Sequence, residues 1–143
     1  MVNNLDVFMN AGGMEDEVEE GEGVVDVSVI FSQQGKISLY FGEMCDGLPD
    51  GFGIRIQELG IVDIGQWKDG KKHGWNREIR YDHSTHAEYV NGQKNGKMCV
   101  YLWDGSYRTG YWSLGQAEGE WLNYEVGGKL NHKEQYKNNK KIS

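Results

Sequence analysis

Proline and cysteine are scarce in this chain, and long apolar runs are missing. The 143 residues include one Pro and two Cys, Cys45 and Cys99, which do not form a CxxC pair. Two such thiols indicate reduced packing residues of an intracellular protein and not a disulfide framework. No apolar run approaches the ~18 residues of a membrane span, and the N-terminus lacks a signal-peptide pattern. We therefore expect a cytoplasmic or otherwise intracellular protein, with membrane or cytoskeletal association left open.

Basic residues are missing from the first part of the chain. Residues 1–30 contain eight Asp or Glu and no Lys or Arg, whereas residues 31–143 contain 14 acidic and 15 basic residues. A segment rich in like charges and poor in apolar residues cannot offset its ordering entropy. We therefore predict an acidic, disordered tail at residues 1–23. Its charge would repel phosphates, so we expect no nucleic-acid partner.

Glycine, in contrast, is abundant and recurs at a fixed spacing. The chain has 21 Gly, and each Gly inside a helix costs ~1 kcal/mol relative to Ala, which disfavours a helical protein. One short motif, each copy of which we call a phrase, occurs four times: a large apolar residue is followed after three positions by Gly, and after four more by a second Gly. These structural glycines are Gly47 and Gly51, Gly70 and Gly74, Gly92 and Gly96, and Gly115 and Gly119. In a fifth phrase, opened by Tyr136, Asn139 and Ser143 take their places.

A period of about 23 residues predicts an array of identical small units. Each unit holds two short segments rich in aromatic and branched residues, and turn signals such as Asp104-Gly105 separate them. Such turns need positive φ and are typical of hairpins. The predicted fold is all-β, a single-layer twisted antiparallel meander of about five β-hairpin repeats and roughly ten strands. We expect a capping hairpin at 24–39 and repeats at 40–62, 63–85, 86–106, 107–130 and 131–143, the last one partial.

The phrases resemble the MORN repeat family, whose units are hairpins of about this length. The resemblance rests on Tyr40-Phe41-Gly42 with Asp50-Gly51-Phe52-Gly53, on Gly65-Gln66-Trp67 with His73-Gly74-Trp75, and on Gly110-Tyr111-Trp112 with Gly119-Glu120-Trp121. It covers residues 40–143 and implies a β-hairpin array that holds partners.

Two narrower resemblances point to regulatory proteins. Residues 14–17, 46–52 and 134–139 are similar to the amino-terminal MORN region of a SET-domain lysine methyltransferase. Methyl transfer is not implied, because the cofactor motif of that family is missing. The C-terminal half is similar to bacterial YwqK-type, antitoxin-like repeat proteins. These resemblances imply a regulatory or antitoxin-like subunit of a separate enzyme as one alternative function.

Residues capable of catalysis do not form a recognisable set. His73 stands at a repeat position typical of a turn role. His83 and His86 flank a predicted turn, but apart from Asp82 and Glu88 no Cys or carboxylate joins them at metal-ligand spacing. Neither cysteine has a His at a recognisable spacing, so both thiols are interpreted as inert. We therefore expect no catalytic residue, no metal and no cofactor, and we interpret the protein as not an enzyme.

Repeat arrays present long surfaces that hold partners. The main hypothesis is therefore a non-enzymatic protein-interaction or scaffold protein with a protein partner of unknown identity. Aromatic residues dominate interface energies, and the candidate anchors are Trp67, Tyr89, Trp103, Trp112 and Trp121. The alternative role of these rings is the core, as a row of stacked rings with glycines beside them.

Lysines near the turns support a second hypothesis. If the repeats are in register, one edge would carry Lys68, Lys71, Lys72, Lys94 and Lys97. This edge would bind acidic phospholipid headgroups, an acidic protein segment or the chain's own acidic tail, and a purely solubilising role is the alternative. The C-terminal edge strand would also allow a homodimer.

Overall fold

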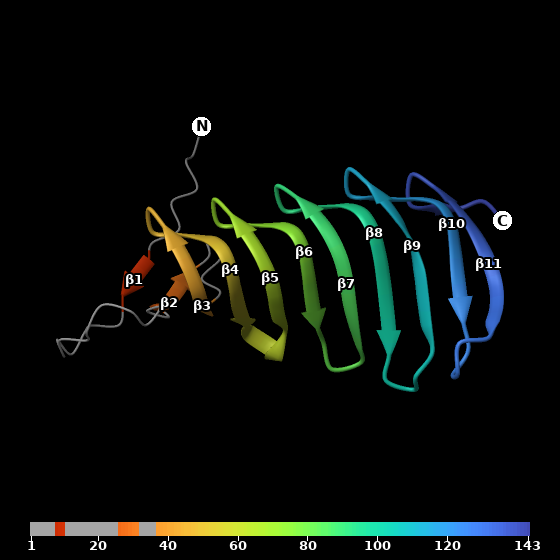
Figure 1. The fold of residues 1–143 in the computed structure, drawn as a ribbon, viewed down its shortest axis with the longest axis horizontal. Helices are drawn as coiled ribbons and strands as arrows, with labels where there is room; N and C mark the ends of the chain where they lie inside the picture. Colours follow the sequence, from red (N-terminus) through yellow and green to blue (C-terminus); the bar gives the residue numbers. More distant parts are fainter. Residues whose placement is uncertain (1–7, 11–25, 32–36) are drawn as a thin grey trace.

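The computed structural model describes the backbone of residues 8–10 and 26–31 and all of residues 37–143. Within these ranges the chain forms one open antiparallel sheet whose strands pair in chain order (Figure 1). The strands are β1 Phe8–Asn10, β2 Asp26–Phe31, β3 Ile37–Cys45, β4 Leu48–Gln57, β5 Val62–Lys68, β6 Lys71–Ile79, β7 His83–Val90, β8 Gln93–Leu102, β9 Tyr107–Ser113, β10 Gln116–Tyr124, β11 Leu130–Lys137 and β12 Lys140–Lys141. The predicted all-β antiparallel meander is confirmed.

The remaining elements of the described ranges are short. A 3-10 turn, η1 Glu58–Gly60, joins β4 to β5, and these ranges contain no α-helix. None of their helical residues forms a segment of the length and apolarity needed to span a bilayer. Apart from β1, the predicted acidic tail at residues 1–23 lies outside the described residues. Of the predicted capping hairpin, β2 pairs with β3 from Asp26 opposite Gly42 to Phe31 opposite Ile37, while its turn lies outside them.

Two-residue turns close one end of the hairpins. The first glycine of each phrase is the second turn residue, at Gly47, Gly70, Gly92 and Gly115. Both residues of these turns have positive φ, for example 49° at Asn91 and 81° at Gly92. Such turns match the right-handed twist of the paired strands. In the last hairpin the turn is Asn138-Asn139, with φ of 50° and 65°, because Asn tolerates the left-handed region better than most residues.

Hydrogen bonds join the two-residue turns from Asp69-Gly70 onward to the preceding hairpin. The N–H of Gly92 donates to the carbonyl of Lys72 at 2.8 Å, and the N–H of Asn91 lies 3.5 Å from Nδ1 of His73. Equivalent bonds join Gly115 to Lys94, Leu114 to Asn95, Asn139 to Ala117 and Asn138 to Glu118. His73 therefore contacts a turn, as the sequence predicted.

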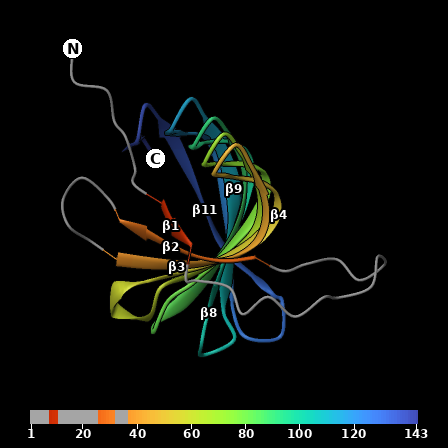
Figure 2. The same cartoon turned by 90° about the vertical axis from the view of Figure 1, so that its left-hand side faces the viewer.

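The large buried side chains lie on one face of the sheet, which we call the core face. Its large buried hydrophobic residues are Tyr40, Trp67, Tyr89, Met98 and Trp121. Trp112 and Tyr136 are half-buried and pack against this cluster. Seen end-on, the strands curve instead of lying flat (Figure 2). This curvature lets side chains of the core face cover one another, so that apolar surface is removed from water without a second layer.

The rings do not form the predicted stack of one ring directly on the next. Tyr40 meets Trp67 edge-to-face, with centroids 5.7 Å apart and planes at 85°. Trp121 stands edge-on to both Trp112 and Tyr136, at 6.3 and 5.8 Å. Rings from one strand of a hairpin thus alternate with side chains from the other strand. Edge-to-face contact is favoured because the positive edge of one ring meets the negative face of its neighbour.

The second glycine of each phrase lies opposite the ring of the next unit, as predicted. In register, Gly51 pairs with Trp67, Gly74 with Tyr89, Gly96 with Trp112 and Gly119 with Tyr136. The expected reason for these glycines is wrong at all four positions, because the atoms nearest to an added Cβ belong to no ring. Gly96 is an example. A Cβ there would collide with the carboxylate of Glu88 and not with a ring. The glycines that rings do contact are Gly53, below Tyr40, and Gly110, below Trp121.

Candidate binding groove

The face opposite the core face, which we call the outer face, exposes large apolar side chains. Trp75, Tyr101 and Tyr111 are 47%, 46% and 48% exposed, and Phe52 is 55% exposed. Successive residues of a strand point to opposite faces, so the neighbours of core residues lie here. Large apolar side chains exposed on one face of a sheet are typical of interaction sites.

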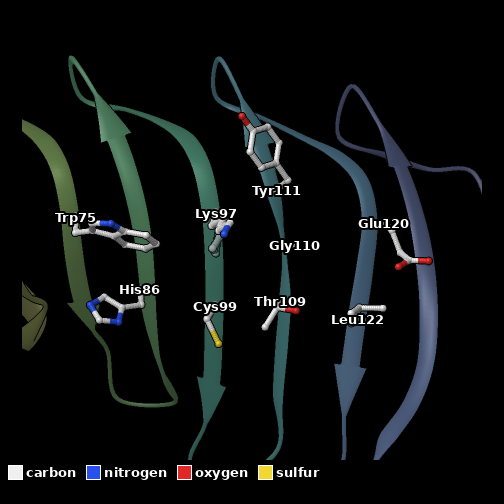
Figure 3. Close-up of a pocket in the computed structure, with 10 residues that line it drawn as sticks. Trp75, His86, Lys97, Cys99, Thr109, Gly110, Tyr111, Glu120 and Leu122 are labelled. Atoms are coloured by element: carbon white, nitrogen blue, oxygen red, sulfur yellow. The ribbon is translucent and has the colours of Figure 1, made fainter.

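A groove of about 500 Å³ crosses the outer face over β6 to β10 (Figure 3). Its floor is a row of small and medium side chains that pair across successive strands: His86, Cys99, Thr109 and Leu122. The larger side chains beside this row are Trp75, Lys97, Tyr111 and Glu120. On β8, β9 and β10 a short side chain of the floor lies two residues from a longer one, so the groove runs across the strands.

Aromatic contacts hold the surroundings of the groove in place. The indole of Trp75 meets the imidazole of His86 edge-to-face at 5.8 Å. On the other side of the floor, a second cross-strand row consists of Tyr101, Tyr107 and Tyr124. Tyr107 and Tyr124 are stacked, with centroids 4.5 Å apart and planes at 13°. Packed rings have few rotamers to lose, so a partner would meet a largely preformed surface.

The charges in the groove are balanced. Lys97 is the basic residue and Glu120 the acidic residue that line it, and the remaining surface is mainly apolar. A groove with one charge of each sign and exposed rings is suited to a protein segment and not to a polyanion.

The structure brings together His86 and Cys99, a pair that sequence spacing does not reveal. They lie opposite each other on β7 and β8. Burial raises the pKa of the Cys99 thiol, whereas a nucleophilic cysteine needs a lowered pKa. The other thiol, Cys45, is exposed and is not the buried packing residue that was expected. Asp46 raises its pKa.

The predicted histidine pair does not converge. His83 and His86 are three residues apart on β7, so their side chains lie on opposite faces of the sheet. His83 contributes to the core face and His86 to the outer-face groove. In residues that the structure describes, no group of three His, Cys, Asp or Glu side chains is placed to hold a metal ion.

Four of the five predicted aromatic anchors lie on the core face, and this corrects the sequence prediction. Trp67, Tyr89 and Trp121 are 3%, 6% and 2% exposed, and Trp112 packs half-buried against them. Rings that form the core cannot also insert into a partner. Only Trp103 is exposed, and its indole N–H donates to the carbonyl of Tyr81 at 2.7 Å.

The five predicted lysines do not form one edge. Lys68 and Lys71 pair across a turn and are exposed. Lys72 and Lys94 lie on the core face, each 5.0 Å from the centre of a ring. Lys97 lies in the outer-face groove. The lysines separate because a shift of one position along a strand moves a side chain to the other face.

Comparison with known proteins adds no assignment to this site. No protein-family model matches the chain, and no curated protein matches it significantly in sequence. A fold alone does not fix a function, so the functional inference rests on the groove itself.

Proposed function

We propose that the chain is a non-enzymatic protein-interaction module built from MORN-type β-hairpin repeats, and that the outer-face groove holds a segment of a protein partner. The observation that carries this proposal is the pair of half-exposed rings, Trp75 and Tyr111, beside a preformed groove. Burial of apolar surface yields about 25 cal/mol per Å², and Trp and Tyr are the residues that most often dominate interfaces.

The recurrence of one local geometry supports the MORN-type assignment. The two-residue turns occur at the first glycine of successive phrases, as at Gly70 and Gly92. The second glycines, such as Gly74, each lie opposite the ring of the next hairpin. Each hairpin therefore repeats the contacts of the one before it, which is how repeat arrays extend a continuous surface.

The groove specifies the chemistry of its occupant. Its apolar floor and flanking rings favour an extended segment with apolar side chains at its centre. Lys97 and Glu120 would pair with an acidic and a basic residue at the borders of that segment. Such border pairs contribute little affinity but fix the orientation of the segment.

The groove residues favour binding over catalysis. On the groove floor, Cys99 lies beside His86 and is the candidate nucleophile. Burial raises the pKa of its thiol. A thiol that stays protonated at neutral pH is a poor nucleophile. We therefore extend the proposal to an intracellular scaffold that lacks chemistry of its own.

Matched variants test the proposal. The tagged full-length chain would be used to recover partners from its native cells, and Trp75→Ala and Tyr111→Ala would be compared with Phe52→Ala. All three residues are about half exposed, so the folded state should tolerate each change. We expect the two groove variants to lose a stoichiometric partner that Phe52→Ala retains.

Alkylation of the two cysteines locates the bound partner. Cys99 lies on the groove floor, whereas Cys45 lies beside a distant turn. A partner in the groove should slow the reaction of Cys99 with iodoacetamide and leave Cys45 unchanged. Equal rates at both thiols in the complex, or partner loss in Phe52→Ala alone, would place the interaction elsewhere.

A further inference from the structure

Four cations lie over aromatic rings on the core face. Arg55 lies 4.7 Å from the centre of the Trp67 ring, and Arg108 lies 4.4 Å from that of Trp121. Between them, Lys72 covers Tyr89 and Lys94 covers Trp112. Lys72 and Lys94 occupy the same position in consecutive repeats, two residues after the turn glycine.

Carboxylates of the chain neutralise the first two cations. Asp63 is fully buried and accepts hydrogen bonds from Nη2 of Arg55 at 2.9 Å and from Nε at 3.2 Å. Its second oxygen contacts the ammonium of Lys72. Lys72 also donates to Glu78 at 3.1 Å. Buried charges are retained in this way because an unpaired one would lose its hydration without compensation.

One repeat later the carboxylates are replaced by uncharged residues. Asp63 and Glu78 are the carboxylates beside Lys72. The residues at the equivalent positions in the repeat of Lys94 are Thr85 and Val100. All four residues pair in one cross-strand row. Among described residues, no carboxylate oxygen lies within ion-pair distance of the Lys94 ammonium. Burial lowers the pKa of Lys94, and the charges of Lys72 and Arg80 lower it further against the opposing effect of Glu78.

Arg108 adds a second cation, which has only a long ion pair within the described residues. It is the neighbour of Val100 in the cross-strand row. Its Nη2 lies 4.0 Å from Glu134, whose carboxylate already pairs with Lys141 at 2.8 Å. The Nε of Arg108 is buried and has no hydrogen-bond acceptor within the described residues.

A groove opens at this place on the core face. Its volume is about 390 Å³, and its lining includes Met98, Val100, Arg108 and Trp112, the ring that Lys94 covers. We propose that this groove binds a carboxylate side chain from an acidic segment of a partner protein. Arg108, which lines the groove, and Lys94, which covers the Trp112 ring of its lining, would hold that carboxylate. The carboxylate would form an ion pair with the Lys94 ammonium, as Asp63 and Glu78 do with that of Lys72.

The chain itself indicates why a carboxylate fits. In the preceding repeat the group between the cations is a carboxylate, and it satisfies an arginine and a lysine at once. Charge-assisted hydrogen bonds of this kind are about twice as strong as neutral ones. Because the site lies on the opposite face from the outer-face groove, its loss would leave binding there intact.

Titration of the full-length chain with acetylated hexaglutamate amide tests the proposal, with hexaglutamine amide and inorganic phosphate as comparison probes. The indole N–H signals of the ¹⁵N-labelled protein separate the two faces, because Trp112 lines this groove and Trp75 lines the other. We expect hexaglutamate to shift the Trp112 signal and not that of Trp75, and hexaglutamine to shift neither.

Three variants assign the binding. Lys94→Met should weaken hexaglutamate binding at least about tenfold, while Lys129→Met, the same change at an exposed lysine outside both grooves, should not. Thr85→Asp should also abolish binding, because it supplies the carboxylate from within the chain. Retained binding in both Lys94→Met and Thr85→Asp would overturn the proposal.

Other occupants would give different results. An equal shift by phosphate would indicate a site for free phosphate and would overturn the assignment to an acidic segment. A Trp112 shift that grows with protein concentration in the absence of peptide would show that acidic residues of a second copy of the chain occupy the groove. This result would overturn the assignment to a partner protein.

Discussion

Gly110 lies directly beneath the indole of Trp121. A Cβ at position 110 would overlap Cδ2 and Cε2, the atoms shared by the two rings of the indole. Gly110 does not have the positive φ of the turn glycines, so its backbone conformation is open to other residues. The ring alone therefore excludes a side chain here, and this close approach is what leaves Trp121 only 2% exposed.

Gly110→Ala should lower the free energy of unfolding by about 1–3 kcal/mol, the usual effect of overpacking a core. Urea denaturation followed by circular dichroism would measure it. Thr109→Ser, a change at the adjacent residue on the outer face, is the matched control and should have a small effect. A Gly110→Ala protein with the midpoint of the parent would mean that the ring does not rest on this glycine.

The two faces should respond differently to the loss of a tryptophan. Trp121→Ala removes a buried ring that contacts Trp112 and Tyr136, and we expect a loss of about 3–5 kcal/mol. Trp75→Ala removes a half-exposed ring, and its effect should be within about 1 kcal/mol. Similar losses for both variants, measured by thermal and urea unfolding, would contradict the assignment of core and outer faces.

Acid should weaken the fold through Glu78. Burial opposes its ionisation, but the hydrogen bond from Arg80 and the charge of Lys72 outweigh burial and lower its pKa from 4.5 to about 2. A carboxyl whose folded pKa is depressed stabilises the protein above its unfolded pKa, and this contribution is lost as the pH falls through the folded pKa. About 2–3 kcal/mol of stability should therefore disappear between about pH 5 and pH 2.

Glu78→Gln isolates this contribution. The variant should be less stable than the parent at pH 7, and the difference should shrink as the pH approaches 2. The variant will keep some acid sensitivity, because the hydrogen bond from Lys141 also lowers the pKa of Glu134 to about 2. A stability difference that does not change with pH would show that Arg80 and Lys72 do not lower the pKa of Glu78.

The hairpins could be predicted from the sequence because their signals are local. A turn such as Asn91-Gly92 needs two positive φ angles, and few residue pairs supply them. The glycine spacing therefore located the turns, and the position of His73 next to one of them followed from it.

The faces could not be predicted because they depend on the register within each strand. The pairing shifts at bulges between Gly65 and Trp67 and between Ala87 and Tyr89, and a shift of one residue exchanges the two faces. For this reason rings such as Trp67 were predicted as surface anchors, and the outer-face ring Trp75 was missed. The pairing of His86 with Cys99 depends on the same register.

Lys72 and Lys94 occupy equivalent repeat positions over a ring, yet their replacement by Met should have opposite effects. Burial alone would lower the pKa of Lys72, but Asp63 and Glu78 raise it. Lys72→Met leaves the buried Asp63 with Arg55 as its remaining cationic partner and leaves Glu78 with Arg80. Removing one member of a buried ion pair costs about 3–5 kcal/mol, and we expect a loss of this size.

Lys94→Met removes an ammonium that has no carboxylate partner in the described residues. Met retains most of the length and packing of the lysine stem, while the desolvation cost of the charge disappears. The melting temperature should therefore stay level or rise, in contrast to that of Lys72→Met. Thermal unfolding of both variants in one buffer makes the comparison. If Lys94→Met melted as far below the parent as Lys72→Met, the Lys94 ammonium would already be compensated within the chain, and the anion site on the core face would lose its basis.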